Sequence, residues 1–174
     1  MRIAVRKLFL GATIMAGLSS PTFAIPFPAI GPTTPGNSAL LRGSEALAPV
    51  NAPMSVKRAI WAANQLRTKP YRFGGGHKSF HDTAYDCSGT ISYALAGAGL
   101  VSVPMNSKEF RAYGSRGPGK WITVYARNGH TFAVIAGLRL DTTSPHNPNR
   151  RWAPRWQPTD RTPRGFEVRH PIGL

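Results

Sequence analysis

The sequence predicts an α+β fold in which helices pack on a small antiparallel sheet. Two helix-like patterns come first, over residues 54–67 and 88–100. The alternation typical of strands follows over residues 121–127 and 130–136. Asn128-Gly129, the strongest two-residue hairpin signal, separates these two strands. Because helices and strands are segregated along the chain, the α+β class is favoured over an alternating α/β arrangement.

The first helix is predicted from apolar residues at three-and-four spacing. These residues share one face, and they are Val56, Ala59, Ile60, Ala63 and Leu66. Ser55 is the candidate N-cap, and Pro70 is expected to end the helical pattern. We therefore expect the apolar face of this helix to lie on the core.

The second helix begins at the only cysteine of the 174 residues. Cys87 lies where the glycine-rich residues 74–76 give way to the helix, which Asp86 or Ser88 can cap. The helix dipole and the unpaired N–H groups at a helix N-terminus favour a thiolate, which is the nucleophilic form of cysteine. This placement suits covalent catalysis. The alternative is a buried cysteine that acts as a small hydrophobic residue.

Residues 1–24 are interpreted as a secretory signal peptide. A basic start is followed by an apolar run over residues 8–18 and by Thr22-Phe23-Ala24, a small-residue cleavage site. The apolar run is short for a membrane span, which makes an uncleaved anchor the weaker alternative. We expect a secreted or periplasmic protein associated with the cell wall. In an oxidising compartment a single cysteine indicates either an intermolecular disulfide or a reactive thiol.

Two further segments complete the predicted domain organisation. Residues 25–53 are rich in proline, glycine and alanine and are expected to form a linker, with inhibition of the site left open as a second role. Residues 54–174 then form one catalytic domain with a basic C-terminal tail. The tail after Ser144 is expected to wrap the surface, and residues 166–168 are a candidate edge strand.

The charge of the chain limits its partners. The formal charge is +15, and removal of residues 1–24, which hold three basic and no acidic residues, leaves +12. Anionic polymers of the cell envelope are candidate partners, although a solvated basic surface explains the same pattern. No nucleic-acid motif is recognised. Scattered histidines and one cysteine lack metal-ligand spacing, so no metal site is expected. We also expect no cofactor, no stable membrane anchor and no second subunit.

A histidine and an aspartate can complete a catalytic site with Cys87. His130 opens the strand after the hairpin, and Asp141 lies in a third short strand that the turn at Gly137-Leu138 makes a neighbour. A cysteine nucleophile needs a base and a polar group that orients this base. His130 and Asp141 are the candidates for these roles. Backbone N–H groups at the start of the helix, including that of Cys87, are the candidate oxyanion donors.

Three segments resemble the NlpC-type, papain-like cell-wall cysteine peptidases. They are Tyr71-x-Phe73-Gly74-Gly75, Asp86-Cys87-Ser88-Gly89-x-Ile91-x-Tyr93-Ala94 and Gly129-His130-x-x-x-Val134-Ile135-x-Gly137, and the resemblance covers about residues 55–142. It implies a papain-like domain with Cys87 as nucleophile and His130 as base. It also implies hydrolysis of peptide bonds in peptidoglycan stem peptides, often between D-glutamate and diaminopimelate. Tyr71, Asp86 and Ser88 match positions that shape the substrate pocket in that family.

The sequence departs from this family at three places. Phe73 stands where the family has tryptophan, and Gly119-Lys120-Trp121 replaces an acidic turn before the hairpin. Asp141 stands where the third residue is typically histidine, with His146 as the alternative third residue. Two other functions therefore stay open. One is a non-catalytic module that binds the cell envelope, and the other is an amidase or acyltransferase on the same fold.

Overall fold

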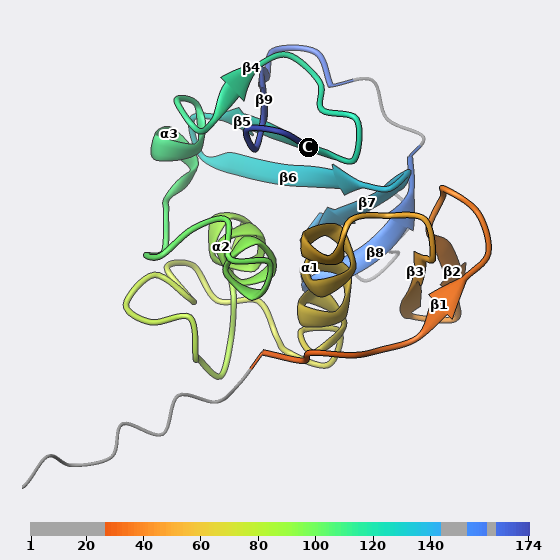
Figure 1. Cartoon of the computed structure of the whole chain (residues 1–174). Coiled ribbons are helices and arrows are strands. Elements are labelled where there is room, and N and C mark those ends of the chain that lie inside the picture. Colours follow the sequence, from red (N-terminus) through yellow and green to blue (C-terminus); the bar gives the residue numbers. More distant parts are fainter. Residues whose placement is uncertain (1–26, 144–152, 160–162) are drawn as a thin grey trace, which may run out of the picture.

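The computed structural model describes residues 27–143, 153–159 and 163–174, and it has two helices and a sheet at its centre (Figure 1). The helices are α1 (Met54–Asn64), α2 (Cys87–Gly97) and the short α3 (Ser107–Phe110). The main sheet has six strands in the order β4-β9-β5-β6-β7-β8. Their bounds are β4 (Ser115–Arg116), β5 (Ile122–Arg127), β6 (His130–Ile135), β7 (Leu138–Asp141), β8 (Arg155–Pro158) and β9 (Glu167–His170). The predicted α+β class is confirmed.

Helix α1 buries the predicted apolar face. Its apolar residues at positions 56, 59, 60 and 63 are buried, as is Leu66 just beyond its end. The predicted N-cap was wrong, because Pro53 occupies the N-cap position and no side chain caps the helix. The helix also ends at Asn64, several residues before Pro70. The chain after it forms hydrogen-bonded turns, such as the one in which the Gln65 N–H donates to the carbonyl of Ala62.

Helix α2 lies beside α1 next to the main sheet (Figure 1), and it is buried from Cys87 to Leu95. Of the two candidate caps, Asp86 is the N-cap, and its side chain accepts a hydrogen bond of 2.8 Å from the Gly89 N–H. Near the other end, Gly97 lies against Ala62 of α1, where an added Cβ would come within 2.4 Å of the Ala62 Cβ. A glycine is therefore needed for the close approach of these two helices.

The middle of the main sheet is the predicted antiparallel meander. The Asn128-Gly129 turn joins β5 to β6, and Arg127 pairs with His130 across it. The link from β6 to β7 is equally tight, with positive φ at Ala136 and Gly137. Ala133 pairs with Leu140, so β7 is the direct neighbour of β6. The apolar residues of these strands at positions 122, 124, 133, 135 and 140 join the helices in one core cluster.

The described C-terminal residues form strands β8 and β9, whereas the sequence predicted a surface tail with one candidate edge strand. Strand β8 pairs with β7, although the tail was expected to wrap the surface, and its Trp156 is buried. Strand β9 was expected at a sheet edge but pairs with both β4 and β5. The edge position is taken instead by the two-residue β4. Much of the segment predicted to wrap the surface lies outside the described residues.

Residues 27–53 pack on the domain, which differs from the predicted linker. They form the small sheet β1-β3-β2, with β1 (Thr33–Thr34), β2 (Leu40–Arg42) and β3 (Glu45–Pro49). Ala46 and Ala48 are completely buried, because their small side chains let β3 approach α1 closely. Asn64 of α1 bonds both the N–H and the carbonyl of Ala46, at 3.0 and 2.8 Å. The alanine content that suggested a loose arm therefore serves close packing. The predicted signal peptide lies outside the described residues.

Candidate active site

Cys87 is the first residue of α2 and is nearly buried, with 7% of its surface exposed. The glycine-rich loop lies directly against this helix end, since the Asp86 N–H donates to the carbonyl of Gly75 at 3.1 Å. An added Cβ on Gly89 would come within 2.1 Å of the same carbonyl oxygen, so this position requires glycine. Within the described residues, the backbone N–H groups of Cys87 and Ser88 have no acceptor. These groups are available to a substrate oxygen.

The structure brings His130 and Asp141 together. His130 is the first residue of β6 and Asp141 the last of β7, and His130 Nε2 lies 3.1 Å from Asp141 Oδ1. Both side chains are almost completely removed from solvent. When the imidazole is protonated, the contact is a buried ion pair. The adjacent strands thus place the base and its predicted orienting group within reach of each other.

His130 also interacts with the Cys87 side chain. Burial disfavours the charged imidazole, but the contacts with Asp141 and Cys87 outweigh it and raise the pKa of His130 to about 9. Because Nε2 faces Asp141, Nδ1 is the ring nitrogen left for the thiol. This arrangement favours an imidazolium that can pair with a thiolate and later donate a proton.

Asp141 has a second cationic neighbour that the sequence analysis missed. Arg139, two residues earlier on β7, donates a hydrogen bond from Nη2 to Asp141 Oδ2, and only 1% of the arginine is exposed. Thr143 donates to the same carboxylate from its N–H and its hydroxyl, both at 3.0 Å. Burial alone would raise the pKa of Asp141, but His130, Thr143 and Arg139 together hold it below its usual value. The available signal was the i, i+2 spacing, which puts both side chains on one face of a strand.

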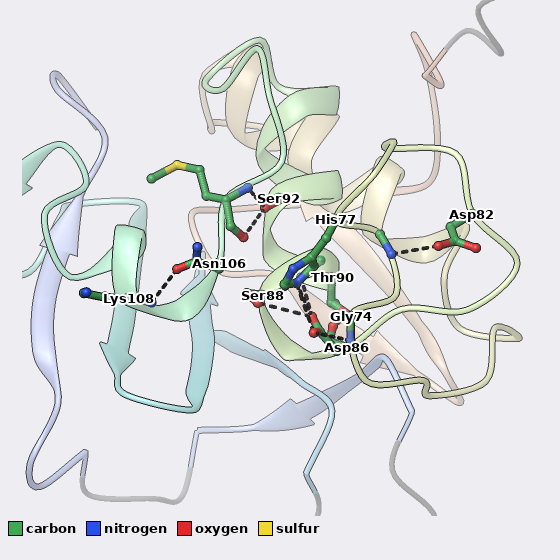
Figure 2. A network of polar contacts seen from close by, with 12 residues as sticks. Gly74, His77, Asp82, Asp86, Ser88, Thr90, Ser92, Asn106 and Lys108 are labelled. Carbon is green, nitrogen blue, oxygen red and sulfur yellow. Dashed lines mark hydrogen bonds and ion pairs between the residues drawn. The ribbon is translucent and has the colours of Figure 1, made fainter.

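A second polar network lies at the start of α2 (Figure 2). Asp86 accepts from the Gly74 N–H at 3.0 Å, and His77 Nε2 lies 3.0 Å from both Asp86 Oδ1 and Ser88 Oγ. The Ser88 hydroxyl donates to Asp86 at 3.2 Å. Two of the predicted substrate-contacting residues are thus fixed beside the nucleophile. His77 was not among the predicted site residues, because its place in this network depends on how the glycine loop folds back.

Tyr71, the third predicted substrate-contacting residue, also lies close to the thiol. Burial, together with the nearby charges of Cys87 and Asp86, raises the pKa of Tyr71. The structure therefore gathers five of the predicted residues around Cys87. The alternative third residue, His146, lies outside the described residues, so its position relative to His130 stays untested.

Two other predictions concern metals and membranes. In the part of the chain that the structure describes, no three histidine, cysteine or acidic side chains gather as metal ligands would. Across those same described ranges, no helix is long and apolar enough to cross a bilayer.

The chain is similar to known proteins whose names refer to peptidoglycan or to NlpC/p60 domains. No family model matches the chain. The peptidoglycan endopeptidase RipB of Mycobacterium tuberculosis is 26% identical over 140 residues, in both strains CDC 1551 and H37Rv. The match covers 66% of this chain and 58% of RipB, so the chain spans less than two thirds of the length of these relatives.

Among solved structures, RipD of Mycobacterium tuberculosis has a TM-score of 0.50 at 17% identity, over 68% of this chain and 98% of that one. It is described as a non-catalytic NlpC/p60 domain protein with an adaptation to peptidoglycan binding. The P60 domain of the Mycobacterium avium subspecies paratuberculosis antigen MAP1204 has a TM-score of 0.45 at 21% identity, covering 66% and 93% of the two chains. The likeness to RipD shows that the chain has an NlpC/p60-type fold, and the predicted resemblance is confirmed.

Proposed function

We propose that this protein is an exported cysteine peptidase that hydrolyses peptide bonds in the stem peptides of peptidoglycan. One observation carries the proposal. The thiol of Cys87 at the start of α2 interacts with His130, whose Nε2 lies 3.1 Å from Asp141. Nucleophile, base and orienting group in this order are the arrangement that thiol acyl transfer requires. The similarity to the endopeptidase RipB supports peptidoglycan as the substrate.

In the first half of the reaction, the Cys87 thiolate attacks the carbonyl carbon of the scissile peptide bond. The oxygen gains negative charge and is stabilised by the backbone N–H groups of Cys87 and Ser88. The His130 imidazolium donates its proton to the amide nitrogen, and the C–N bond breaks. The amine product leaves, and the acyl group stays on the sulfur as a thioester.

In the second half, His130 is neutral and acts as the base. It takes a proton from a water molecule, whose oxygen attacks the thioester carbonyl carbon. The C–S bond breaks, which releases the carboxylic acid product and regenerates the thiolate and the imidazolium. Asp141 stays ionised throughout and stabilises the charged ring.

The side chains around the thiol define a polar entrance for the peptide. We assign substrate contact to Tyr71, Asp86 and Ser88, with a D-glutamyl-diaminopimelate bond as the scissile bond. The Asp86 carboxylate and the two hydroxyls suit the amine and amide groups of a stem peptide. His77, which contacts both Asp86 and Ser88, sets how these groups face the substrate.

A non-catalytic function is the second candidate, because RipD is described as a non-catalytic NlpC/p60 protein adapted to peptidoglycan binding. Retention of Cys87 beside His130 in this chain favours catalysis. An amidase or acyltransferase would use the same nucleophile and differ in the bond cleaved or in the acceptor of the acyl group. In each case the +12 charge of residues 25–174 suits anionic polymers of the cell wall.

The test is a digest of purified peptidoglycan with residues 25–174, which hold every described element, beside the Cys87→Ala variant. Mass spectrometry of the soluble products is expected to find new stem-peptide fragments that the variant does not release, a loss of at least about 10³-fold in rate. The fragment masses identify the bond. Release of the same fragments by Cys87→Ala would refute thiol catalysis. Absence of fragments with both proteins, while both still bind the polymer, would favour the binding module.

A further inference from the structure

A surface hollow lies near His130, and none of the residues that line it is assigned to catalysis. It has a volume of about 450 Å³ and lies at the β5–β6 turn, between α3 and the start of β9. Its lining residues are Arg111, Ala126, Arg127, Asn128, Gly165, Phe166 and Glu167. Arg127 is the register partner of His130, and cross-strand partners present their side chains on the same face of a sheet.

Phe166 connects this hollow to the catalytic histidine. Its ring meets the His130 ring edge-on, with 6.1 Å between the centroids. The Arg127 guanidinium lies over the same Phe166 ring, 4.7 Å from its centroid. An extended peptide advances about 3.3–3.6 Å per residue. A substrate whose scissile bond lies at His130 can therefore reach Arg127 with a group up to about three residues away.

The charges in the hollow favour an anion. Arg111 is held by Asn128 Oδ1 at 3.2 Å and by Glu167 at 3.8 Å, and Glu167 also lies 3.9 Å from Arg169. Arg127 has no acidic partner among the described residues, and its side chain is exposed. A guanidinium presents paired N–H donors that match the two oxygens of a carboxylate.

We propose that this hollow is a subsite for a carboxylate of the stem peptide, with Arg127 as the residue that selects it. The proposal rests on the proposed function, and it adds the specificity of the site. Phe166 holds the guanidinium flat and keeps water from one side of it. Arg127 acts on substrate selection, while the chemistry stays with Cys87 and His130.

Binding measurements test the subsite without turnover. Calorimetry on Cys87→Ala protein uses the tripeptide L-alanyl-γ-D-glutamyl-diaminopimelate and three analogues, each with one carboxylate replaced by a carboxamide. One analogue is expected to bind about 10-fold or more weaker than the parent peptide. Adding Arg127→Gln is expected to weaken the parent peptide by a similar factor and to leave that analogue unchanged. Arg42→Gln, on β2, removes the same charge elsewhere and is expected to change neither affinity.

Three results would overturn the subsite. They are equal affinity of all four peptides, an unchanged affinity of the parent peptide in Arg127→Gln, and an equal loss in Arg42→Gln. Cleavage of the parent peptide by protein that retains Cys87 separates this inference from the proposed function. If the parent peptide is not cleaved but Arg127→Gln still weakens its binding, the hydrolase function is refuted and the subsite is supported. If the parent peptide is cleaved but Arg127→Gln does not change its binding, the subsite is refuted and the hydrolase function is supported.

Discussion

The candidate catalytic residues were predictable from the sequence to the extent that short segments carry them. Cys87 and His130 lie in recognisable motifs, and Asp141 follows His130 through a tight turn that makes their strands neighbours. Arg139 and His77 were missed, because their roles depend on contacts across the folded chain. Arg139 bonds the Asp141 carboxylate, and His77 reaches Asp86 only because the glycine loop returns to the helix end.

Arg139 provides the first prediction at the residue scale. In Arg139→Met, Asp141 keeps the burial that disfavours its charge and loses a cation, so its pKa is expected to rise. The proposed mechanism requires an ionised Asp141, so the acidic limb of the kcat/KM profile is expected to move to higher pH. The limb is measured by the rate of peptide cleavage across the acid range.

Arg139→Lys is the matched variant, since it keeps the charge and is expected to keep the acidic limb near its wild-type position. Arg116→Met controls for the loss of an arginine outside the site. An unchanged limb in a folded Arg139→Met protein would contradict the role of Arg139 as a positioning residue. If the methionine variant does not fold, the lysine variant still tests the charge: a limb displaced despite the retained charge would contradict the role.

Secondary-structure elements were predictable where their signals are local. Helical spacing and the Asn128-Gly129 turn located α1, α2 and the β5–β6 hairpin. Some of the strands that were missed or misplaced depend on distant contacts. Strand β9 pairs with β5 about forty residues earlier, and β3 packs on α1 through backbone contacts to Asn64. Such pairings leave little trace in local periodicity, because they depend on which surfaces the rest of the fold leaves free.

Asn64 gives a prediction at the element scale. Its side chain bonds the N–H and carbonyl of Ala46 in β3 and also accepts from Trp156 Nε1 in β8, at 2.9 Å. Asn64→Leu leaves these buried polar groups without partners, each at a cost of about 1–3 kcal/mol. We expect the free energy of unfolding to fall by about 2–5 kcal/mol in a single urea transition.

Arg58→Ala, on the exposed side of α1, is the control and is expected to stay within about 0.5 kcal/mol of wild type. A loose N-terminal arm would give a different result, since loss of its contacts would leave the stability of the domain unchanged. Wild-type stability in Asn64→Leu would therefore contradict the packing of residues 27–53 as part of the fold.

At the scale of the whole molecule, the fold brings His130 of β6 and Asp141 of β7 to Cys87 at the start of α2. Because two of these groups have shifted pKa values, the free energy of unfolding is expected to depend on pH. Between its ordinary pKa of 6.5 and its raised value of about 9, His130 holds a proton in the folded protein that it would release on unfolding. Its contribution is therefore fully present below pH 6.5 and is lost as the pH rises through about 9. Asp141, whose pKa is lowered, contributes above about pH 3.8, and this contribution is lost as the pH falls.

We therefore expect the unfolding free energy to decrease between pH 6.5 and 9.5, by up to about 3 kcal/mol from the His130 shift alone. Urea unfolding across this range measures the decrease. His130→Gln has no titrating ring and is expected to be less stable at pH 6 but to have a much flatter profile. His81→Gln, which removes a half-buried histidine away from Cys87 and Asp141, controls for the removal of a histidine. A wild-type slope in His130→Gln would show that other groups carry the dependence, and would contradict a protonated His130 held between Cys87 and Asp141.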